Sequence, residues 1–313
     1  MTNARDFSTA DRRRAAVGAG LFALLIGFGG LARPARADKC LDQYIAKLDV
    51  DALQAKATND LTHAQARDLI LYLVQQEQIS LPSGNGWTPL FNGACEIIPG
   101  PLKFPSTANR ISIVNKVGDA RFFMYANNQP PTRQGKPFAP ARLDNLQPRL
   151  VVGLHRLVAL LNGPEQNLRV YEIYTNGIAN VDQGDHKAGV AFDLAGVKGE
   201  RVDTRDTQLF VLDDWGNQPV RKEDRDDAVT GHWKRSVTKT EYRLNANGAS
   251  APARDFFRLV HDFFAREFAG CPGNAIENKC PTDRLKHPDY PISSTGTYGR
   301  EGHANHIHAG MRP

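Results

Sequence analysis

The chain has 313 residues, with 39 Lys and Arg against 34 Asp and Glu, and a formal net charge of +5. Residues 1–37 hold six arginines and two aspartates, so they contribute +4 of this charge and leave the remainder near +1. Proteins that bind nucleic acid present a basic face with interleaved aromatic residues, and this balance does not indicate one. The remaining 276 residues suffice for one large domain, or for one domain and a smaller one.

The first 37 residues have the pattern of an export signal. Arg12, Arg13 and Arg14 precede an apolar run over 15–32, and Ala35-Arg36-Ala37 supplies a small-x-small cleavage site. The run is close to the roughly 18 apolar residues of a membrane span, but its glycines lower its hydrophobicity. We therefore expect cleavage before Asp38, no stable membrane insertion afterwards, and a periplasmic or secreted protein. Both the Sec and the twin-arginine route stay open.

The four cysteines are Cys40, Cys95, Cys271 and Cys280. Disulfides are the expected state of an exported protein. The short loop between Cys271 and Cys280 favours that pair, which leaves Cys40 with Cys95. Four free thiols are the alternative. A zinc-thiolate site is disfavoured because the chain has no Cys-x-x-Cys pair.

Residues 38–140 are expected to form an accessory N-terminal region that begins with helices. Spaced apolar residues over 40–55 predict the first helix. The sequence Thr62-His63-Ala64-Gln65 resembles a capping box and predicts the start of a second helix, which continues over 66–75.

The second half of this region is less regular. Residues 81–147 are rich in Pro, Gly and Asn, with short strand-like runs at 110–114 and 120–125. The region is either a separate domain or a wrap around residues 141–313, which we expect to form the catalytic domain.

Beyond residue 145 the periodicity is clearer, and it mixes helices with strands without a regular βαβ rhythm. This predicts an α+β fold. The expected elements are a helix over 150–161 that stops at Asn162-Gly163-Pro164, strands at 168–175, 189–197 and 208–212, a helix over 255–268, and a last strand at 306–311.

Histidines and one aspartate stand out in two segments. His186 and Asp193 lie in the first, and His303, His306 and His308 lie within six residues in the second. Residues i and i+2 of a strand point to the same face, so we expect His306 and His308 to project into one site.

These residue types suit zinc. A catalytic zinc takes three protein ligands, imidazole nitrogens or carboxylate oxygens, and keeps a fourth position for water. His186 and Asp193 reach the same ion if Asp193 lies on a strand entered through Gly189, whose conformational freedom allows the bend. The third ligand then comes from the His306–His308 strand. A second histidine beside the ion is expected to accept a proton or to stabilise an oxyanion.

The first segment matches a known motif. His186-x6-Asp193 fits its short form, and Gly189 and Ala191 complete the longer His-x-x-Gly-x-Ala-x-Asp form. The second segment, His303-x-x-His306-x-His308, supplies the His-x-His that follows far downstream. In this order the two segments resemble the LAS metallopeptidases, which include lysostaphin, the D-alanyl-D-alanine peptidases and the hedgehog domain.

The resemblance extends over about residues 145–313, and it implies a small, mostly antiparallel sheet with flanking helices. The His303 spacing is most similar to that of the penicillin-insensitive murein endopeptidases. The resemblance implies zinc as cofactor, bound by His186, Asp193 and His308, catalysis by His306, and a further catalytic or orienting role for His303.

The chain also departs from these relatives. It has no Glu-x-x-His base, since Glu301 lies five residues before His306. Tyr174-Thr175-Asn176-Gly177 replaces a Ser-Gly-Tyr-Arg stretch whose arginine often holds a substrate carboxylate. We therefore expect endopeptidase cleavage of peptide crosslinks in peptidoglycan. The alternatives are an inactive, hedgehog-like zinc module and a zinc hydrolase of another amide or of a glycan.

Simpler interpretations of the same residues exist. His186 and Asp193 can form an ordinary salt bridge, and the C-terminal histidines can be a metal-scavenging tail. Asp213 and Asp214 are expected to be turn residues. A serine triad is disfavoured because the chain has no Gly-x-Ser-x-Gly elbow.

Overall fold

The computed structural model describes residues 35–82, 91–92, 94–96, 110–125, 138–164, 166–178, 184–201, 207–225, 233–242, 244, 247–269, 292–293 and 306–311. From Ala35 onward the chain forms one compact unit. The predicted cleavable signal falls largely outside the described residues, as do Cys271, Cys280, Glu301 and His303. Their predicted roles therefore stay predictions.

Short helices open the described part of the chain: α1 (Ala35–Ile45), α2 (Val50–Gln54), the 3-10 turn η1 (Thr58–Asp60) and α3 (His63–Gln75). The single helix expected over 40–55 is divided into two. The Asp49 side chain accepts a hydrogen bond from Ala52 N at 3.0 Å and so begins a new helix there.

Two local predictions in this region are confirmed. Thr62 Oγ1 accepts from Gln65 N at 3.2 Å and Gln65 Oε1 accepts from Thr62 N at 3.0 Å, which is the capping box expected before α3. Cys40 and Cys95 form a disulfide with an S–S distance of 2.06 Å. The bond ties α1 to the segment 94–96.

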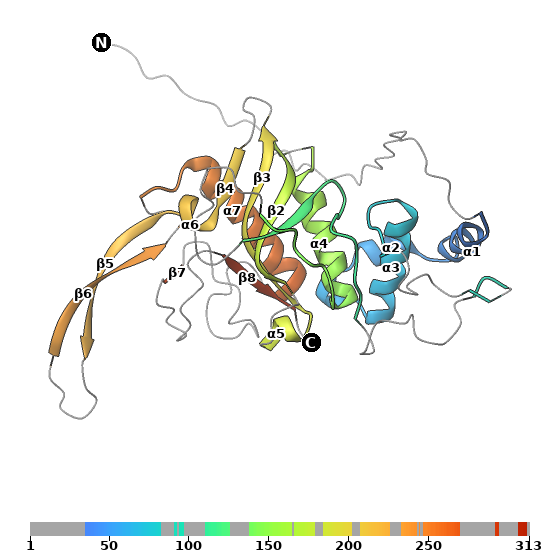
Figure 1. Ribbon diagram of the computed structural model, residues 1–313, viewed down its shortest axis with the longest axis horizontal. Coiled ribbons are helices and arrows are strands. Elements are labelled where there is room, and N and C mark those ends of the chain that lie inside the picture. The colour runs from blue at the N-terminus through green and yellow to red at the C-terminus, as the bar shows by residue number, and fades with distance from the viewer. Residues whose placement is uncertain are drawn as a thin grey trace, which may run out of the picture. The chain divides into compact units, whose positions relative to one another are not determined.

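A five-stranded sheet forms the centre (Figure 1). Its order is β1 (Arg121–Met124), β2 (Leu168–Ile178), β3 (Ala191–Arg201) and β4 (Thr207–Phe210), and β8 (Ile307–Gly310) also pairs with β3. The expected α+β class is confirmed.

The sheet is mixed: the pairs formed by β3 are antiparallel, in line with the mostly antiparallel sheet that was expected, but the pair of β1 and β2 is parallel. β1 runs parallel to β2, whereas β2, β4 and β8 run antiparallel to β3. Parallel neighbours need a long crossover, and α4 (Pro148–Leu161) lies in the connection between β1 and β2. The sequence predicts a short strand at 120–125 within the accessory region, and the pairing of this strand with β2 was not expected.

The remaining elements follow β2 and β4. They are α5 (Gly184–Lys187), α6 (Val211–Asp214), α7 (Ala251–Phe264) with the π-helical turn η2 (Ala265–Ala269), and a second sheet of β5 (Asn217–Arg225), β6 (Trp233–Tyr242) and β7 (Ile292–Ser293). The long β5–β6 hairpin was not expected from the sequence (Figure 1). The sequences of its two strands are mostly polar and show no regular alternation of apolar and polar residues.

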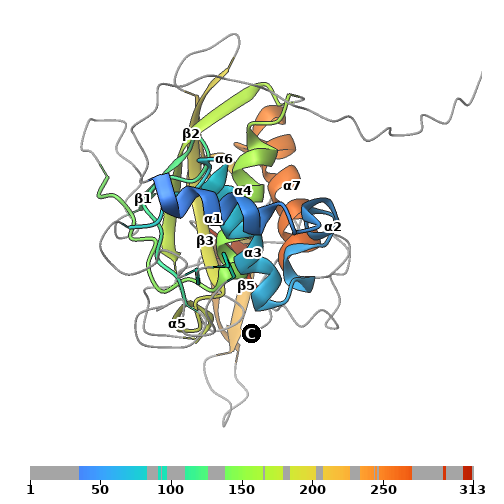
Figure 2. The ribbon, with the colours of Figure 1, turned by 90° about the vertical axis from the view of Figure 1, so that its right-hand side faces the viewer.

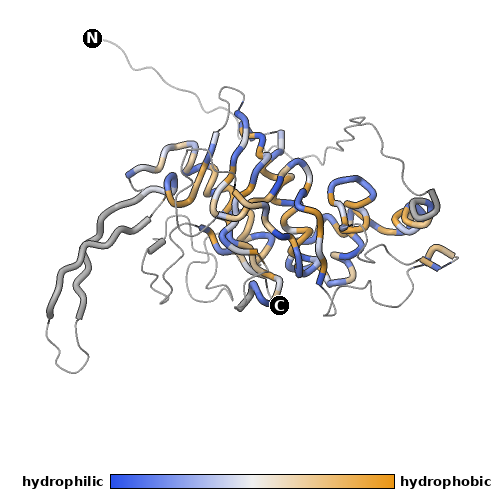
Figure 3. The backbone as a smooth tube through the Cα atoms, in the orientation of Figure 1, coloured by the Kyte–Doolittle hydropathy of each residue, from blue (hydrophilic) through white to orange (hydrophobic). Residues whose placement is uncertain are grey.

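Helices cover one face of the central sheet. Figures 1 and 2 show α4 and α7 side by side along β2 and β3, with α3 packed on α4. Apolar positions gather where helices and strands meet (Figure 3). Buried residues from both sides of position 140 share this core, and the predicted domain boundary stays a prediction. Representative core residues are Leu69, Phe122, Leu154, Ile173, Val197, Phe257 and Ile307.

The other face of the sheet carries a separate aromatic cluster. It contains Tyr125, Tyr174, Ala195 and Phe210. The rings of Tyr174 and Phe210 meet with centroids 5.0 Å apart. They do so over Gly196, where an added Cβ would lie 2.5 Å from the Phe210 ring. Within the described residues, no helix is both long and apolar enough to cross a membrane.

Candidate metal centre

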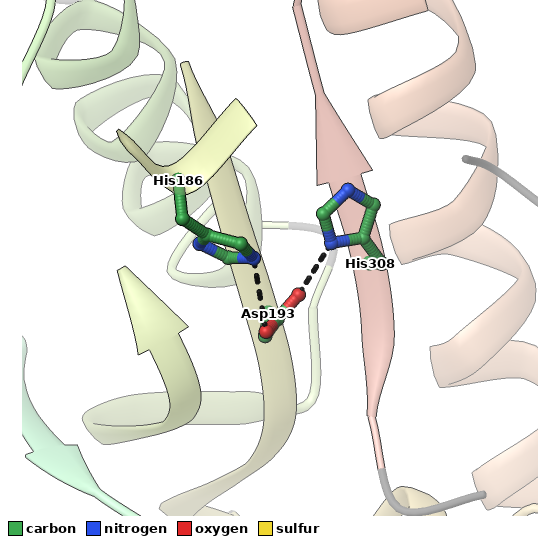
Figure 4. A group of neighbouring side chains, drawn as sticks. All are labelled: His186, Asp193 and His308. Atoms are coloured by element: carbon green, nitrogen blue, oxygen red, sulfur yellow. Dashed lines mark hydrogen bonds and ion pairs between the residues drawn. The ribbon is translucent and has the colours of Figure 1, made fainter. Parts of the chain in front are cut away.

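Three separate segments bring the predicted ligands together. His186 comes from α5, Asp193 from β3 and His308 from β8, and their side chains point toward one another (Figure 4). One donor atom from each residue lies within 4.8 Å of the other two. The group is therefore able to contact a single metal ion.

The turn between α5 and β3 depends on Gly189, as expected. Gly189 has φ +68°, and its N–H donates to His186 O at 2.9 Å. An added Cβ would lie 2.2 Å from Arg110 Nη1 and 2.5 Å from Asn145 O. Both the backbone conformation and the lack of space require glycine at this position. The turn returns the chain so that the His186 ring faces Asp193.

Strand pairing places His308. β8 runs antiparallel to β3 with Asp193 directly opposite His308. Facing residues of an antiparallel pair have neighbouring Cβ atoms on one side of the sheet, which brings together side chains far apart in sequence. His306, two residues earlier, contacts the same carboxylate, so the expected common face of His306 and His308 is confirmed.

Asp193 lies at the centre of these contacts. His308 Nδ1 is 2.7 Å from its Oδ1, and His186 Nε2 is 3.2 Å from its Oδ2. His306 Nε2 lies 3.5 Å from Oδ1. Asp193 is 6% exposed. Burial alone would raise its pKa, but the surrounding histidines outweigh burial and hold the pKa far below its ordinary value. The carboxylate is therefore ionised at neutral pH.

The donor set fits zinc. Zinc in proteins binds imidazole nitrogen and carboxylate oxygen, and bonds of about 2.0–2.2 Å in a tetrahedron separate the ligand atoms by roughly 3.3 Å. The 3.2 Å between His186 Nε2 and Asp193 Oδ2 matches this spacing, whereas the 2.7 Å between His308 Nδ1 and Asp193 Oδ1 is a hydrogen-bond distance.

His186 has a second feature that bears on this fit. Its Nδ1 is buried and has no hydrogen-bond partner among the residues that the structure describes. Metal-bound histidines usually donate their other ring N–H to a partner. A partner for this nitrogen must therefore come from water or from outside the described ranges.

His306 is placed beside the group. It is 4% exposed, and its Nδ1 lies 3.2 Å from Asn176 Nδ2. Sequence reasoning missed Asn176 as a site residue. The signal was available, because Asn176 stands in the stretch Tyr174–Gly177 that departs from the resembling peptidases.

The two acidic residues after β4 are outside the site. Asp214 Oδ2 accepts a hydrogen bond from Phe210 N at 2.7 Å, and both Asp213 and Asp214 lie in the short helix α6. Asp214 thus stabilises the strand-to-helix turn, as expected.

Comparison with known proteins finds no match: no protein-family model, no curated protein and no solved structure matches this chain.

Proposed function

We propose that this protein is a zinc-dependent peptidase of the LAS type that cleaves peptide crosslinks of bacterial peptidoglycan. The observation that supports it best is the convergence of His186 and His308 on the buried Asp193, with His306 beside them. The LAS motif assigns metal binding to the same three positions.

Each side chain has a distinct task in this proposal. His186 and His308 bind as neutral imidazoles, and the ionised Asp193 supplies the one negative charge. Zinc bound by these residues would lower the pKa of a bound water towards about 7 and would polarise a carbonyl oxygen. His306 lies beside the ligands, with its Nε2 3.5 Å from Asp193 Oδ1, and is the proposed catalytic group.

The substrate class follows from the resemblance and from one departure. The stretch that carries a carboxylate-binding arginine in many relatives contains Asn176 here, directed to His306. An internal crosslink has no free carboxylate at the scissile bond, so this change favours an endopeptidase. The Cys40–Cys95 disulfide is compatible with the exported location that such a substrate requires.

One observation favours an enzyme over an inactive zinc module. A structural zinc site has a closed set of ligands, whereas the position of His306 places a further titratable group next to the ligands. Zinc hydrolysis of another amide or of a glycan is the remaining alternative, and substrate assays distinguish it.

The test combines metal analysis with murein cleavage. We expect about one zinc per chain in the mature protein, muropeptide release from isolated murein, and loss of both in His308→Ala. His63→Ala is a matched control because it removes a histidine from the start of α3, outside the metal group. Bound zinc without muropeptide release would favour another substrate or a binding role. Absence of zinc in the gently purified protein would overturn it.

A further inference from the structure

A cavity lies among the helices and shares no residue with the metal group. It has a volume of about 350 Å³ and forms where α3, α4 and the end of α7 with η2 meet, next to the end of α2 (Figure 2). α3, α4 and the α7–η2 segment each line it with residues three or four positions apart, which lie on the same side of a helix. The cavity is therefore a product of helix packing and not of the turns that build the metal centre.

The floor of the cavity is apolar and its rim is polar. Leu69, Leu73, Val152 and Phe263 line it, and each of them is 5% exposed or less. Arg266 also lines it, with a side chain that is 62% exposed. Small-molecule sites in proteins combine an apolar surface with a few polar groups, in volumes of about 300–1,000 Å³. The cavity has the size and the lining of such a site.

The charged groups of the lining leave an excess of positive charge. Arg156 and Arg266 are balanced by one carboxylate, that of Glu267, which already accepts hydrogen bonds from Arg156 and Thr58. Arg266 contacts Glu267 through Nε at 3.4 Å, and its Cζ lies 5.9 Å from the centre of the Phe263 ring. Its two terminal nitrogens have no partner in the part of the chain that the structure describes. Such a pair of N–H donors binds a carboxylate through both of its oxygens.

A second polar group of the lining is also without a partner. The half-buried His155 on α4 makes no hydrogen bond with the residues that the structure describes. Burial, together with the charge of Arg156, lowers the pKa of His155 to about 4. Its ring is therefore neutral at neutral pH and offers one N–H donor and one acceptor nitrogen. A polar group taken out of water without a partner costs free energy, which a ligand that hydrogen-bonds to it recovers.

We propose that this cavity binds a small aliphatic carboxylate, with the carboxylate group at Arg266, His155 as a further hydrogen-bonding group, and the hydrocarbon chain against Leu69, Leu73 and Val152. The excess positive charge selects an anion. The apolar floor selects a hydrocarbon chain over a small inorganic ion, because burying apolar surface is favourable. This binding function goes beyond the proposed hydrolase and does not depend on it.

The test is a calorimetric titration of the mature protein with octanoate. We expect saturable binding of one octanoate per chain. Octanol has the same chain without the charge and should bind at least about 10-fold more weakly, since it loses charge-assisted hydrogen bonds. Octylammonium has the opposite charge and inorganic phosphate has no chain, so neither should bind in the same concentration range.

Two variants locate the site. Arg266→Gln removes the charge and should raise the Kd for octanoate about 10- to 100-fold. Arg258→Gln is the matched control, because it removes the same charge from an exposed position of α7 that does not line the cavity. Ala159 is an exposed lining residue, so Ala159→Phe adds a ring at the cavity and should abolish binding. Urea unfolding verifies that all three variants are folded.

Three results would overturn the proposal. They are absence of octanoate binding, equal affinity for octanoate and octylammonium, and native affinity for octanoate in both Arg266→Gln and Ala159→Phe. Failure of the hydrolase function would instead appear as missing zinc or missing muropeptide release, and it would leave the octanoate result unaffected.

Discussion

The buried Asp193 and the half-buried Glu267 have opposite surroundings. Glu267 in η2 accepts hydrogen bonds from Thr58 N at 3.0 Å and Thr58 Oγ1 at 2.9 Å, and it pairs with Arg156 at 2.8 Å. Asp193 is surrounded instead by three histidines. An arginine is always charged, so the charge of Glu267 is permanently balanced. Histidines can lose their protons, so Asp193 can exchange protonated neighbours for a metal ion.

The Glu267 network therefore has a structural role, whereas the Asp193 group is the candidate site. Arg156 uses its other hydrogen bonds on backbone oxygens, with Lys56 O at 2.6 Å and Gln54 O at 3.1 Å. This network joins the N-terminal helices to α4 and η2. The Asp193 group is held by the turn at Gly189 and by the pairing of β3 with β8. Four experiments test this difference, from the largest expected effect to the smallest.

Asp193→Asn should have the largest effect on metal binding. The change removes the only negative charge of the group while retaining its shape, so two neutral imidazoles remain as ligands. We expect a loss of zinc affinity greater than the 10- to 100-fold that follows from losing an outer partner, together with loss of activity. Titration with a competing chelator measures the affinity. Retention of stoichiometric zinc would contradict the assigned ligand set.

Glu267→Ala should mainly affect stability. It leaves Arg156 partly buried without its carboxylate, and breaking such a pair costs about 3 kcal/mol. Burial raises the pKa of Glu267, but the hydrogen bonds from Thr58 and the charge of Arg156 lower it by more, so the pKa lies below its ordinary value. The stabilisation is therefore present above the ordinary glutamate pKa and is lost as pH falls through the folded pKa. Urea unfolding should show a much lower free energy of unfolding for Glu267→Ala than for the native protein at neutral pH. This difference should become smaller in acid, and the zinc content should not change.

Gly189→Ala should reduce both zinc affinity and the free energy of unfolding, each by less than the two changes above. A non-glycine residue at φ +68° costs about 1–2 kcal/mol, and the new Cβ meets Arg110 and Asn145 O. Because this turn positions His186, we expect weaker zinc binding along with reduced stability. Gly163→Ala, at the end of α4 and at a roomier position, is a matched control. Equal effects of the two changes on zinc affinity would argue against a specific role of the Gly189 turn.

Asp119→Asn should have the smallest effect. Asp119 pairs with Arg169 at 3.5 Å, with side chains 61% and 72% exposed. Exposed ion pairs contribute about 0–1 kcal/mol, so the free energy of unfolding should change little. This small change should not vary with pH as the effect of Glu267→Ala does. A destabilisation as large as that of Glu267→Ala would mean that burial is not what distinguishes the two pairs.

Local features of the fold were predictable from short patterns. The capping box at Thr62, the stop of α4 at Asn162 and the bend at Gly189 each depend on neighbouring residues. The convergence of His186, Asp193 and His308 was also predictable, since histidine and aspartate in this order are typical of metal ligands. The β5–β6 hairpin was not predictable, because its strands lack an apolar face to mark them.

By itself, the sequence determined the local elements and the identity of the residues around Asp193, because capping, periodicity and ligand type are properties of short segments. Only the tertiary structure decided that β1 joins the sheet in parallel, that a bulge presents Asn176 to His306, and that Glu267 finds Thr58 and Arg156. These three outcomes depend on strand register and on helix packing between residues far apart in the chain. No short pattern encodes them, because the free energy that selects them comes from burial shared by the whole core.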